Sequence, residues 1–510
     1  MRPRSLPAAV AGWLIVSFAF APPCFAHEFF KITVIDARTK RGVPLVELRT
    51  TNEVRYYTDS NGVVAFHEPG LMDRDVHIRV WSHGYEFPAD GFGTRGKTLR
   101  TTSGAAATLE IQRVNIAERL YRITGAGIYA DSVLTKTPVP TTQPLLNAQV
   151  MGQDTMQCVP YRGRLFWLWG DTGKPSYPLG NFSTTAAWSD LPGKGGLDPS
   201  KGVDLHYFTD DNGFTKRMVP LDEPGPVWLG GLFTLADETG RERLIAHYTR
   251  VNDLSTAEEV GLVIFNDQKE IFERLVRFDL TSPLRESFGH ALRHTTDGVE
   301  YLYFATPFPS LRVRASLAQV KDPKAYESFT CLKPGGRFNK TNPPLERDAA
   351  GKLVYDWKRD TDRVSPGQQQ ELVEAKHIKP DEGYWQMRDV ETGKLIRAHA
   401  GSVFWNAFRK RWVMLFHEVM GRSLLGEVWY AEADDLLGPW SPARRIVTHE
   451  NYSFYNPKHH PYFDQEGGRV IYFEGTYTTF LTNNHPTPRY DYNQIMYRLD
   501  LSDPRLHIKD

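Results

Sequence analysis

The side chains of this sequence that could do chemistry include an aspartate and several histidines that recur at comparable places along the chain. Asp154, His290, His399 and His460 each stand at or near the start of an apolar, strand-like stretch. Carboxyl groups can act as general acids and bases, and imidazoles can do the same or bind a metal. Either chemistry needs several such groups at one place, so the fold must bring together residues that are far apart in sequence.

Five segments share one plan, and this repeat predicts the fold. In each, a polar or small residue opens an apolar strand, a Gly or charged turn follows, and an aromatic strand returns. The openers are Asp154, Gly230, His290, His399 and His460, at intervals of 76, 60, 109 and 61 residues. Such spacing holds four strands per repeat and predicts a five-bladed β-propeller over 148–510. The long third interval predicts an insertion around 310–395, which could form a partial lid.

In a propeller the first strand of every blade lines the central channel. The polar openers would therefore converge at one end of the axis, where burying an unpaired charge would be costly unless the residues had partners or a function. Each carboxylate taken alone could equally belong to a turn or to blade packing. The ends of the second strands add three further acidic residues: Asp171, Glu418 and Glu474.

The region before the repeats predicts a separate small domain. Apolar and polar residues alternate from Phe29 onward, and residues 59–62 (Asp-Ser-Asn-Gly) form a turn signal. We expect a β-sandwich over 27–115 and a linker over 116–147. With 12% aromatic residues, the chain as a whole favours an all-β fold: a small N-terminal sandwich followed by the propeller.

The first 26 residues have the pattern of a signal peptide. Two arginines precede an apolar run over 8–21, and Ala26 follows a short Pro-containing stretch. We expect cleavage after Ala26 and a secreted or periplasmic protein. No later segment approaches 18 uninterrupted apolar residues, so we expect no stable membrane insertion after cleavage. Beyond the signal, Cys158 and Cys331 could pair or remain free thiols.

The charge balance disfavours a nucleic-acid partner. The chain has 510 residues, and its 61 Lys and Arg equal its 61 Asp and Glu. A zero formal net charge provides no basic footprint for a phosphate backbone. The partner expected instead is neutral or mixed in charge.

The N-terminal region resembles a known domain family. Residues 33–46 and 58–63 are similar to the transthyretin-like, or carboxypeptidase-regulatory-like, domain. This resemblance implies an accessory module beside a catalytic or adhesive partner.

The propeller region resembles the five-bladed furanosidase-type glycoside hydrolases, which include arabinanases, xylosidases and fructosidases. The segment 154–172 is similar to their opening blade, and Trp169-Gly170-Asp171-Thr172 resembles a motif of bacterial propellers linked to D-arabinan cleavage. Residues 426–440 match a strand–turn segment that often ends such blades. The resemblance implies that Asp154 is the base. It is incomplete, because Gly230 and Gly231 stand where the family has an Asp and His399 where it has the acidic Glu.

Glycoside hydrolysis needs a protonated carboxyl group at the leaving oxygen and an ionised one that activates water or attacks the sugar. A partly buried Glu418 or Glu474 could keep such a proton. The catalytic candidates are Asp154, Asp171, Glu418 and Glu474. The substrate-binding candidates are His290, His399, His460, Trp228 and Tyr455. No cofactor is required, although a channel calcium or a divalent metal held by the three histidines remains open.

The sequence thus favours an exported glycoside hydrolase that acts on a polysaccharide or oligosaccharide. One alternative is a non-catalytic propeller that binds glycans or other surfaces. Another is a polysaccharide lyase that uses a metal, or a histidine together with Tyr248 or Tyr455. Two carboxylates facing the channel would favour hydrolysis, and three converging imidazoles would favour metal chemistry.

Overall fold

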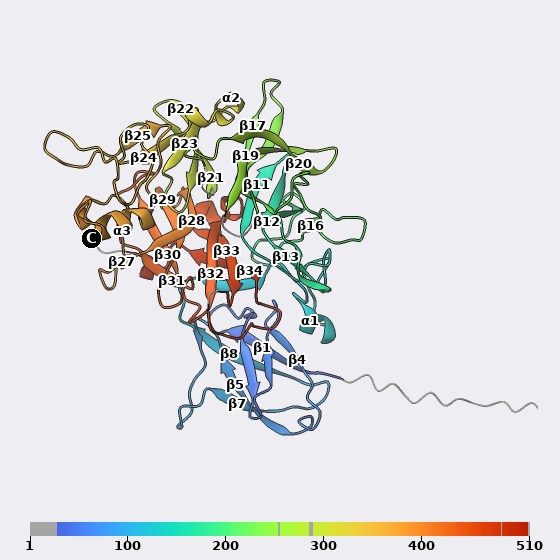
Figure 1. Cartoon of the computed structure of the whole chain (residues 1–510). Helices are drawn as coiled ribbons and strands as arrows, with labels where there is room; N and C mark the ends of the chain where they lie inside the picture. Colours follow the sequence, from blue (N-terminus) through green and yellow to red (C-terminus); the bar gives the residue numbers. More distant parts are fainter. Residues whose placement is uncertain (1–27, 253–255, 285–288, 481, 508–510) are drawn as a thin grey trace, which may run out of the picture.

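The computed structural model describes residues 28–252, 256–284, 289–480 and 482–507, and β-strands dominate it (Figure 1). The all-β prediction, a sandwich followed by a propeller, is confirmed. The signal peptide expected over 1–26 lies outside the described residues. Within the described part, no helix has the length and apolar character needed to cross a membrane.

The N-terminal domain is a sandwich of two four-stranded sheets. In β1 (Phe30–Asp36), buried and half-buried side chains alternate, as expected for a strand that faces a core on one side. Phe30, Ile32 and Val34 pack in that core with Ile78 and Leu109. One sheet has the order β4 (Val63–Phe66), β1, β8 (Ala106–Arg113) and β6 (Tyr85–Glu86); the other has the order β3 (Arg55–Tyr57), β2 (Glu47–Thr50), β5 (Asp75–Trp81) and β7 (Gly96–Arg100).

Five antiparallel sheets, here called sheets 1 to 5, form the propeller. Sheet 1 consists of β11 (Met156–Tyr161), β12 (Arg164–Trp169), β15 (Thr185–Asp190) and β16 (His206–Tyr207); sheet 2 of β17 (Val227–Ala236), β18 (Glu242–Val251), β19 (Ala257–Asn266) and β20 (Ile271–Phe278); sheet 3 of β21 (His290–Thr296), β22 (Val299–Ala305), β23 (Leu311–Arg314), β24 (Glu327–Thr330) and β25 (Asp356–Arg359); sheet 4 of β28 (Ala398–Asn406), β29 (Arg411–Glu418), β30 (Val428–Ala433) and β31 (Arg444–Val447); and sheet 5 of β32 (Ser453–His459), β33 (Val470–Thr478), β34 (Asn493–Asp500) and β9 (Glu118–Arg122).

Smaller strands and short helices accompany these sheets. The strands β10 (Gly152–Gln153), β13 (Thr172–Lys174) and β14 (Tyr177–Asn181) form a three-stranded sheet, and β26 (Met387–Arg388) pairs with β27 (Leu395–Ile396). The helices are α1 (Ala130–Leu134), α2 (Leu317–Val320) and α3 (Pro366–Glu374), with short 3₁₀ turns η1 (Pro323–Ala325), η2 (Pro380–Glu382), η3 (Pro461–Phe463), η4 (Glu466–Gly468) and η5 (Pro504–Leu506).

The first strands of the five sheets form a closed ring. β11 contacts β17, β17 contacts β21, β21 contacts β28, β28 contacts β32, and β32 contacts β11. Within each sheet the strands follow one another outward in sequence order, except that β9 ends sheet 5. The residues at the starts of distant repeats therefore lie around one axis.

The segment expected as a linker, 116–147, has a structural role in the propeller. Its β9 pairs antiparallel with β34, with Arg122 opposite Ile495, so sheet 5 contains strands from both ends of the propeller sequence. The repeat pattern could not reveal this, because β9 precedes the first repeat. Calling the segment a linker was therefore wrong for 118–122.

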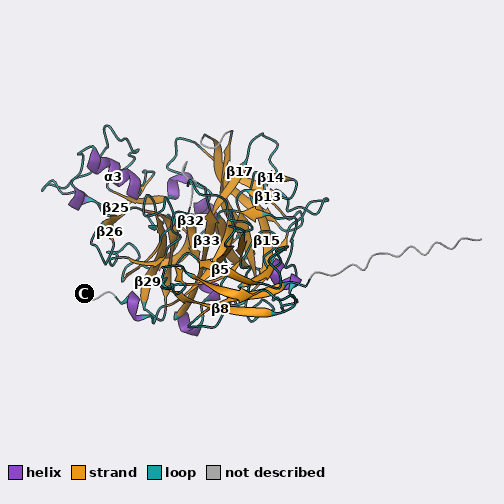
Figure 2. Ribbon diagram, turned by 90° about the horizontal axis from the view of Figure 1, so that it is seen from below, coloured by secondary structure: helices purple, strands orange, loops and turns teal. Residues whose placement is uncertain are grey.

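The insertion between sheets 3 and 4 forms a small cluster of its own. Ser365 caps α3, with its hydroxyl 3.2 Å from the Gln368 amide nitrogen, as expected for a capping box. Leu353, Val364 and Leu372 pack around the buried Cys331. Figure 2 shows α3 and β25 at the periphery of the molecule. Cys331 and Cys158 are both buried free thiols.

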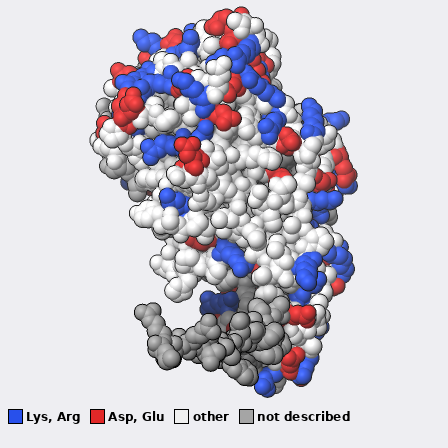
Figure 3. Space-filling model, turned by 90° about the vertical axis from the view of Figure 1, so that its right-hand side faces the viewer, with Lys and Arg blue, Asp and Glu red and all other residues white. Residues whose placement is uncertain are grey.

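Side-chain contacts fix the sandwich to sheets 4 and 5. Arg119, which is fully buried, donates to the backbone oxygens of Pro44 and His83 at 3.0 and 3.2 Å. Leu45 of the sandwich lies in the same apolar cluster as Tyr477 of sheet 5. On the face shown in Figure 3, basic and acidic side chains are interspersed.

Candidate active site

A cavity of about 500 Å³ lies on the propeller axis, at the end where the first strands begin. All five first strands contribute to its lining. Residues from these strands are Gln157, Trp228, Leu229, Gly230, His290, His399, Ala400, Gly401 and Asn456; Thr155 and His247 also line it. No described residue of the 310–395 insertion does so, and the expectation of a lid over this cavity is therefore wrong.

Asp154 lies beside the cavity, just before β11. Neither Asp154 nor Asp171 is a lining residue, but each is hydrogen-bonded to one: Asp154 to Thr155 and Asp171 to Trp228. Its Oδ2 accepts the hydroxyl of Tyr455 at 2.9 Å, and its Oδ1 accepts the backbone N–H of Asp171 at 3.0 Å. Burial raises the pKa of Asp154, while hydrogen bonds from Tyr455, Tyr492 and the Asp171 N–H oppose that shift. These donors favour the ionised form, but burial outweighs them and the net shift of the Asp154 pKa is upward.

Asp171 lies at the end of β12, next to Asp154. Its Oδ1 accepts the indole N–H of Trp228 at 2.9 Å. Burial, together with the neighbouring Asp154 carboxylate and against the opposing hydrogen bond from Trp228, raises the pKa of Asp171 to about 7. A carboxyl group with this pKa retains a proton near neutrality and can donate it.

Local backbone geometry explains why these two aspartates meet. In the pairing of β11 with β12, Met156 lies opposite Trp169 at one end and Tyr161 lies opposite Arg164 at the other. Arg162 and Gly163 form the turn between the strands, both with positive φ. This two-residue hairpin fixes the register and thereby places the flanking aspartates opposite one another. A Cβ on Gly170 would clash with Oδ1 of Asp154, so glycine at this position permits the approach.

Two tyrosines beside the pair remain protonated. Burial and the Asp154 charge raise the pKa of Tyr455 and of Tyr492 above the ordinary tyrosine value. They therefore donate hydrogen bonds and are poor bases. Tyr248, the other tyrosine considered for lyase chemistry, is bonded to Glu259 and does not line the cavity.

His399 lines the cavity, and His417 holds its imidazole ring in place. His417 Nδ1 accepts the Asn456 N–H at 3.1 Å, and His417 Nε2 lies 3.0 Å from His399 Nδ1. Burial lowers the pKa of both histidines, so both are neutral near pH 7. His417 must then donate from Nε2, which leaves His399 with its own proton on Nε2. His399 can therefore donate a hydrogen bond.

His290 and His460 have different surroundings. His290 lines the cavity, and its buried Nδ1 has no hydrogen-bond partner among the described residues. His460 is fully buried, with Nε2 3.0 Å from Glu474 Oε1 and Nδ1 2.7 Å from the Tyr462 hydroxyl. His460 is therefore a core residue rather than a cavity residue, against the prediction that it contacts substrate.

Glu474 is also a core residue. It is 0% exposed and lies opposite Lys458 in the β32–β33 pairing. Burial raises the pKa of Glu474 well above its ordinary value and lowers that of Lys458 to about 7. With no access to the axial cavity, Glu474 is not placed to protonate a substrate.

Glu418 belongs to a second acidic pair, in sheet 4. Its backbone N–H donates to the Glu427 carbonyl at 3.3 Å, and its Oε2 accepts the Trp429 indole N–H at 3.1 Å. A Cβ on Gly421 would lie 2.8 Å from an oxygen of each carboxylate. Burial raises the pKa of Glu418, and the nearby Arg445 opposes the shift. Glu418 does not line the axial cavity, and its indole donor Trp429 does not line it either, whereas Trp228, the donor to Asp171, does.

A metal held by His290, His399 and His460 is not supported. Over the described ranges, no group of three or more His, Cys, Asp or Glu residues could hold an ion. His399 and His460 are also committed to His417 and Glu474. Sequence reasoning misses Thr155, Gln157, His247 and Asn456, which line the cavity. Gln157, His247 and Asn456 are polar residues inside strands and Thr155 directly precedes β11, and such positions give no distinguishing signal.

Comparison with known proteins gives distant structural likenesses. No family model and no curated protein matches the chain. Among solved structures, an exo-beta-1,3-galactanase from Phanerochaete chrysosporium is 10% identical with a TM-score of 0.38, and the match covers 76% of this chain and 66% of that one. An alpha-L-arabinanase from Penicillium chrysogenum is 12% identical with a TM-score of 0.35, covering 76% of this chain and 99% of that one. These scores carry no argument about activity, which rests on the geometry above.

Proposed function

We propose that this protein is an exported glycoside hydrolase that cleaves a polysaccharide or oligosaccharide bound over the axial cavity. The observation that carries the proposal is the Asp154–Asp171 pair, in which one carboxyl group has a pKa of about 7 and the other is surrounded by hydrogen-bond donors. Two carboxyl groups in different protonation states are what glycoside hydrolysis needs. Export is inferred from the residue pattern of 1–26.

Asp171 is assigned as the general acid. Its proton passes to the glycosidic oxygen as the bond from that oxygen to the anomeric carbon breaks. Asp154 is assigned as the ionised partner, which takes a proton from the attacking water or attacks the anomeric carbon itself. The Trp228 indole holds Asp171, and the Tyr455 hydroxyl holds Asp154.

The cavity supplies polar groups that suit a sugar. His399 offers an Nε2 proton, and Gln157 and Asn456 offer amide groups that can donate to and accept from hydroxyls. Gly230 and Gly401 keep the inner wall close to the backbone. Hydroxyl-rich substrates are recognised by such mixed donors and acceptors in a concave site.

The test is the release of reducing ends from a panel of plant, algal and bacterial polysaccharides. Wild type is compared with Asp154→Asn, Asp171→Asn and the sheet 4 control Glu418→Gln, each with and without a chelator. We expect release that both aspartate variants abolish and that the control and the chelator leave intact. If the protein binds one glycan but releases no reducing ends, the propeller has a binding function instead. If only the chelator abolishes the release of reducing ends, the reaction depends on a metal.

A further inference from the structure

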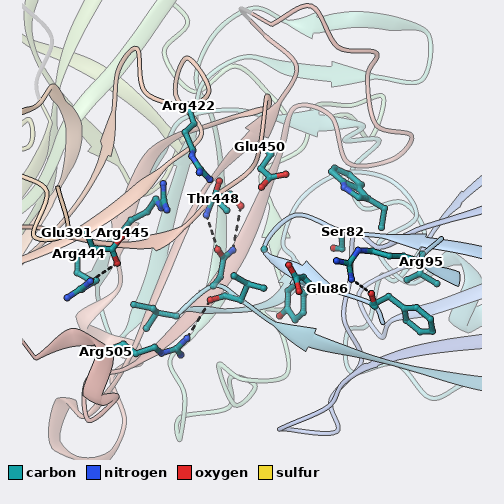
Figure 4. Close-up of a pocket in the computed structure, with 18 of the residues that line it drawn as sticks. Ser82, Glu86, Arg95, Glu391, Arg422, Arg444, Arg445, Thr448, Glu450 and Arg505 are labelled. Atoms are coloured by element: carbon teal, nitrogen blue, oxygen red, sulfur yellow. Dashed lines mark hydrogen bonds and ion pairs between the residues drawn. The ribbon is translucent and has the colours of Figure 1, made fainter. Parts of the chain in front are cut away.

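A second pocket lies between the sandwich and the propeller, away from the axial cavity. It measures about 620 Å³ and is lined by residues of both domains. Trp81 and Glu86 come from the sandwich, and Arg444, Arg445 and Thr448 come from β31 and the residues after it. Figure 4 shows Glu86 on the sandwich side of this pocket and Arg444, Arg445 and Thr448 on the propeller side. Junctions between domains are frequent sites of ligand binding.

Positive charge exceeds negative charge in this junction pocket. Five arginines and three glutamates line it: Arg95, Arg422, Arg444, Arg445 and Arg505, with Glu86, Glu391 and Glu450. Arg444 is paired with Glu391 at 2.7 Å, and Arg505 is held by Asp503 at 2.6 Å. In the described part of the chain, neither Arg95 nor Arg422 forms an ion pair.

These two arginines come from different domains. Arg95 belongs to the sandwich and donates to the backbone oxygen of Phe87, which leaves its charge without a counterion. Arg422 belongs to the loop between β29 and β30 and is exposed. Two guanidinium groups that line one pocket can bind two anionic groups of one ligand, and guanidinium groups bind carboxylates with paired hydrogen bonds.

The pocket also offers an aromatic surface and hydroxyl acceptors. The Trp81 side chain is 41% exposed and packs edge-on against His83, with ring centroids 4.5 Å apart. A sugar ring can lie against such an exposed indole. Glu86 and Glu450 add carboxylate oxygens that can accept sugar hydroxyls. This combination favours an acidic sugar over a simple inorganic anion.

We propose that the junction pocket binds an acidic oligosaccharide through its carboxylate or sulfate groups. This proposal rests on the proposed function, because the ligand would be a charged stretch of the same polymer that the axial cavity cleaves. A second site on one chain raises the effective concentration of the polymer at the first. Binding at the pocket should therefore lower KM for long substrates and leave kcat unchanged.

The experiment is calorimetric titration of the full mature chain with a galacturonic acid tetramer, a sulfated tetramer, a neutral tetramer and inorganic phosphate. The variants are Arg95→Ala and Arg422→Ala, with Arg217→Ala as an exposed control outside the pocket. We expect one acidic tetramer to bind and each pocket variant to weaken its affinity at least tenfold. The Arg217→Ala control should bind that tetramer as wild type does, and the neutral tetramer should not bind. The acidic tetramer that binds identifies the anionic group.

Other outcomes separate the two proposals. Acidic binding that survives both pocket substitutions, or equal binding of phosphate alone, overturns the junction site. Cleavage of a neutral glycan with no acidic binding also overturns it and leaves the proposed function standing. Asp154→Asn should bind the tetramer as wild type does, and loss of binding in that variant would place the ligand in the axial cavity. Thermal unfolding of each variant checks that it is folded.

Discussion

Sheets 1 and 4 each hold two carboxyl groups around a glycine, and their surroundings differ. In sheet 1, Asp154 and Asp171 meet beside Gly170 with tyrosine and tryptophan donors. In sheet 4, Glu418 and Glu427 meet beside Gly421 with the cation Arg445 near both. Burial and the neighbouring carboxylate raise the pKa of Asp171 to about 7, and the same two effects raise the pKa of Glu418 against the opposing charge of Arg445. The two constellations thus differ in the cation beside the sheet 4 pair and in their indole donors, of which Trp228 lines the axial cavity and Trp429 does not.

The largest effect expected is loss of activity on neutralising the sheet 1 pair. Asp154→Asn or Asp171→Asn should lower kcat by about 10²–10⁴, the usual contribution of a general acid or base. Glu418→Gln should stay within about threefold of wild type, because Glu418 is held by Trp429, which does not line the cavity, whereas Asp171 is held by the lining residue Trp228. Reducing-end assays on the substrate found in the panel measure all three. A Glu418→Gln defect as large as that of Asp171→Asn would show that the two pairs are not distinct in function.

The glycines sharpen the same comparison. Gly170→Ala places a Cβ against Asp154, and we expect it to lower activity more than tenfold and stability by about 1–3 kcal/mol. Gly421→Ala crowds Glu418 and Glu427 and should cost similar stability with little loss of activity. Denaturant unfolding and kcat measured on both variants test this. Equal activity losses would mean that strain, rather than the position of Asp154, is responsible.

The pH profile should report the Asp171 proton. Since the general acid works only when protonated, activity should fall as pH rises through about 7. Trp228→Phe removes a hydrogen bond that favours the ionised form, so the alkaline limb should move to higher pH, by about 1 unit or less. Trp429→Phe, which frees Glu418 in sheet 4, should leave the profile in place. A limb that does not move in Trp228→Phe would assign it to another group.

The smallest effect is expected in sheet 5. Burial raises the pKa of Glu474 well above its ordinary value, which favours the neutral form, and Glu474→Gln replaces the carboxyl group with a near-isosteric neutral group. We expect activity within about threefold of wild type and a stability change under about 1.5 kcal/mol. Kinetics and thermal unfolding are the measurements. A loss of 10³ or more would make Glu474 the acid and refute the assignment of Asp171.

Part of this site could be predicted from sequence. The repeat pattern placed Asp154 and Asp171 at matching ends of two paired strands, and a two-residue hairpin keeps that register. The same reasoning failed for Glu474, because β32 contains a register shift between Tyr455 and Lys458 that strict alternation does not anticipate. A similar shift in β28, between Ala398 and Gly401, surrounds His399.

Other features depended on contacts that no local pattern encodes. His460 is buried and hydrogen-bonded because it contacts Glu474 of β33. The role of His417 as the residue behind His399 is a side-chain contact between neighbouring strands. The pairing of β9 with β34 joins segments from opposite ends of the propeller. A local sequence pattern cannot indicate which distant strand will be the partner in such a long-range pairing.

The pairing of β9 with β34 has a consequence for how the chain folds. β9 is made early and its partner β34 is made last, so the contact that completes sheet 5 spans nearly the whole propeller sequence. Closure of so long a loop is slow and comes late, since its entropy must be met before the contact forms. Until then β9 exposes an unpaired strand edge, which is prone to wrong pairing. Truncation before β34 should therefore yield an aggregating chain rather than a shorter propeller.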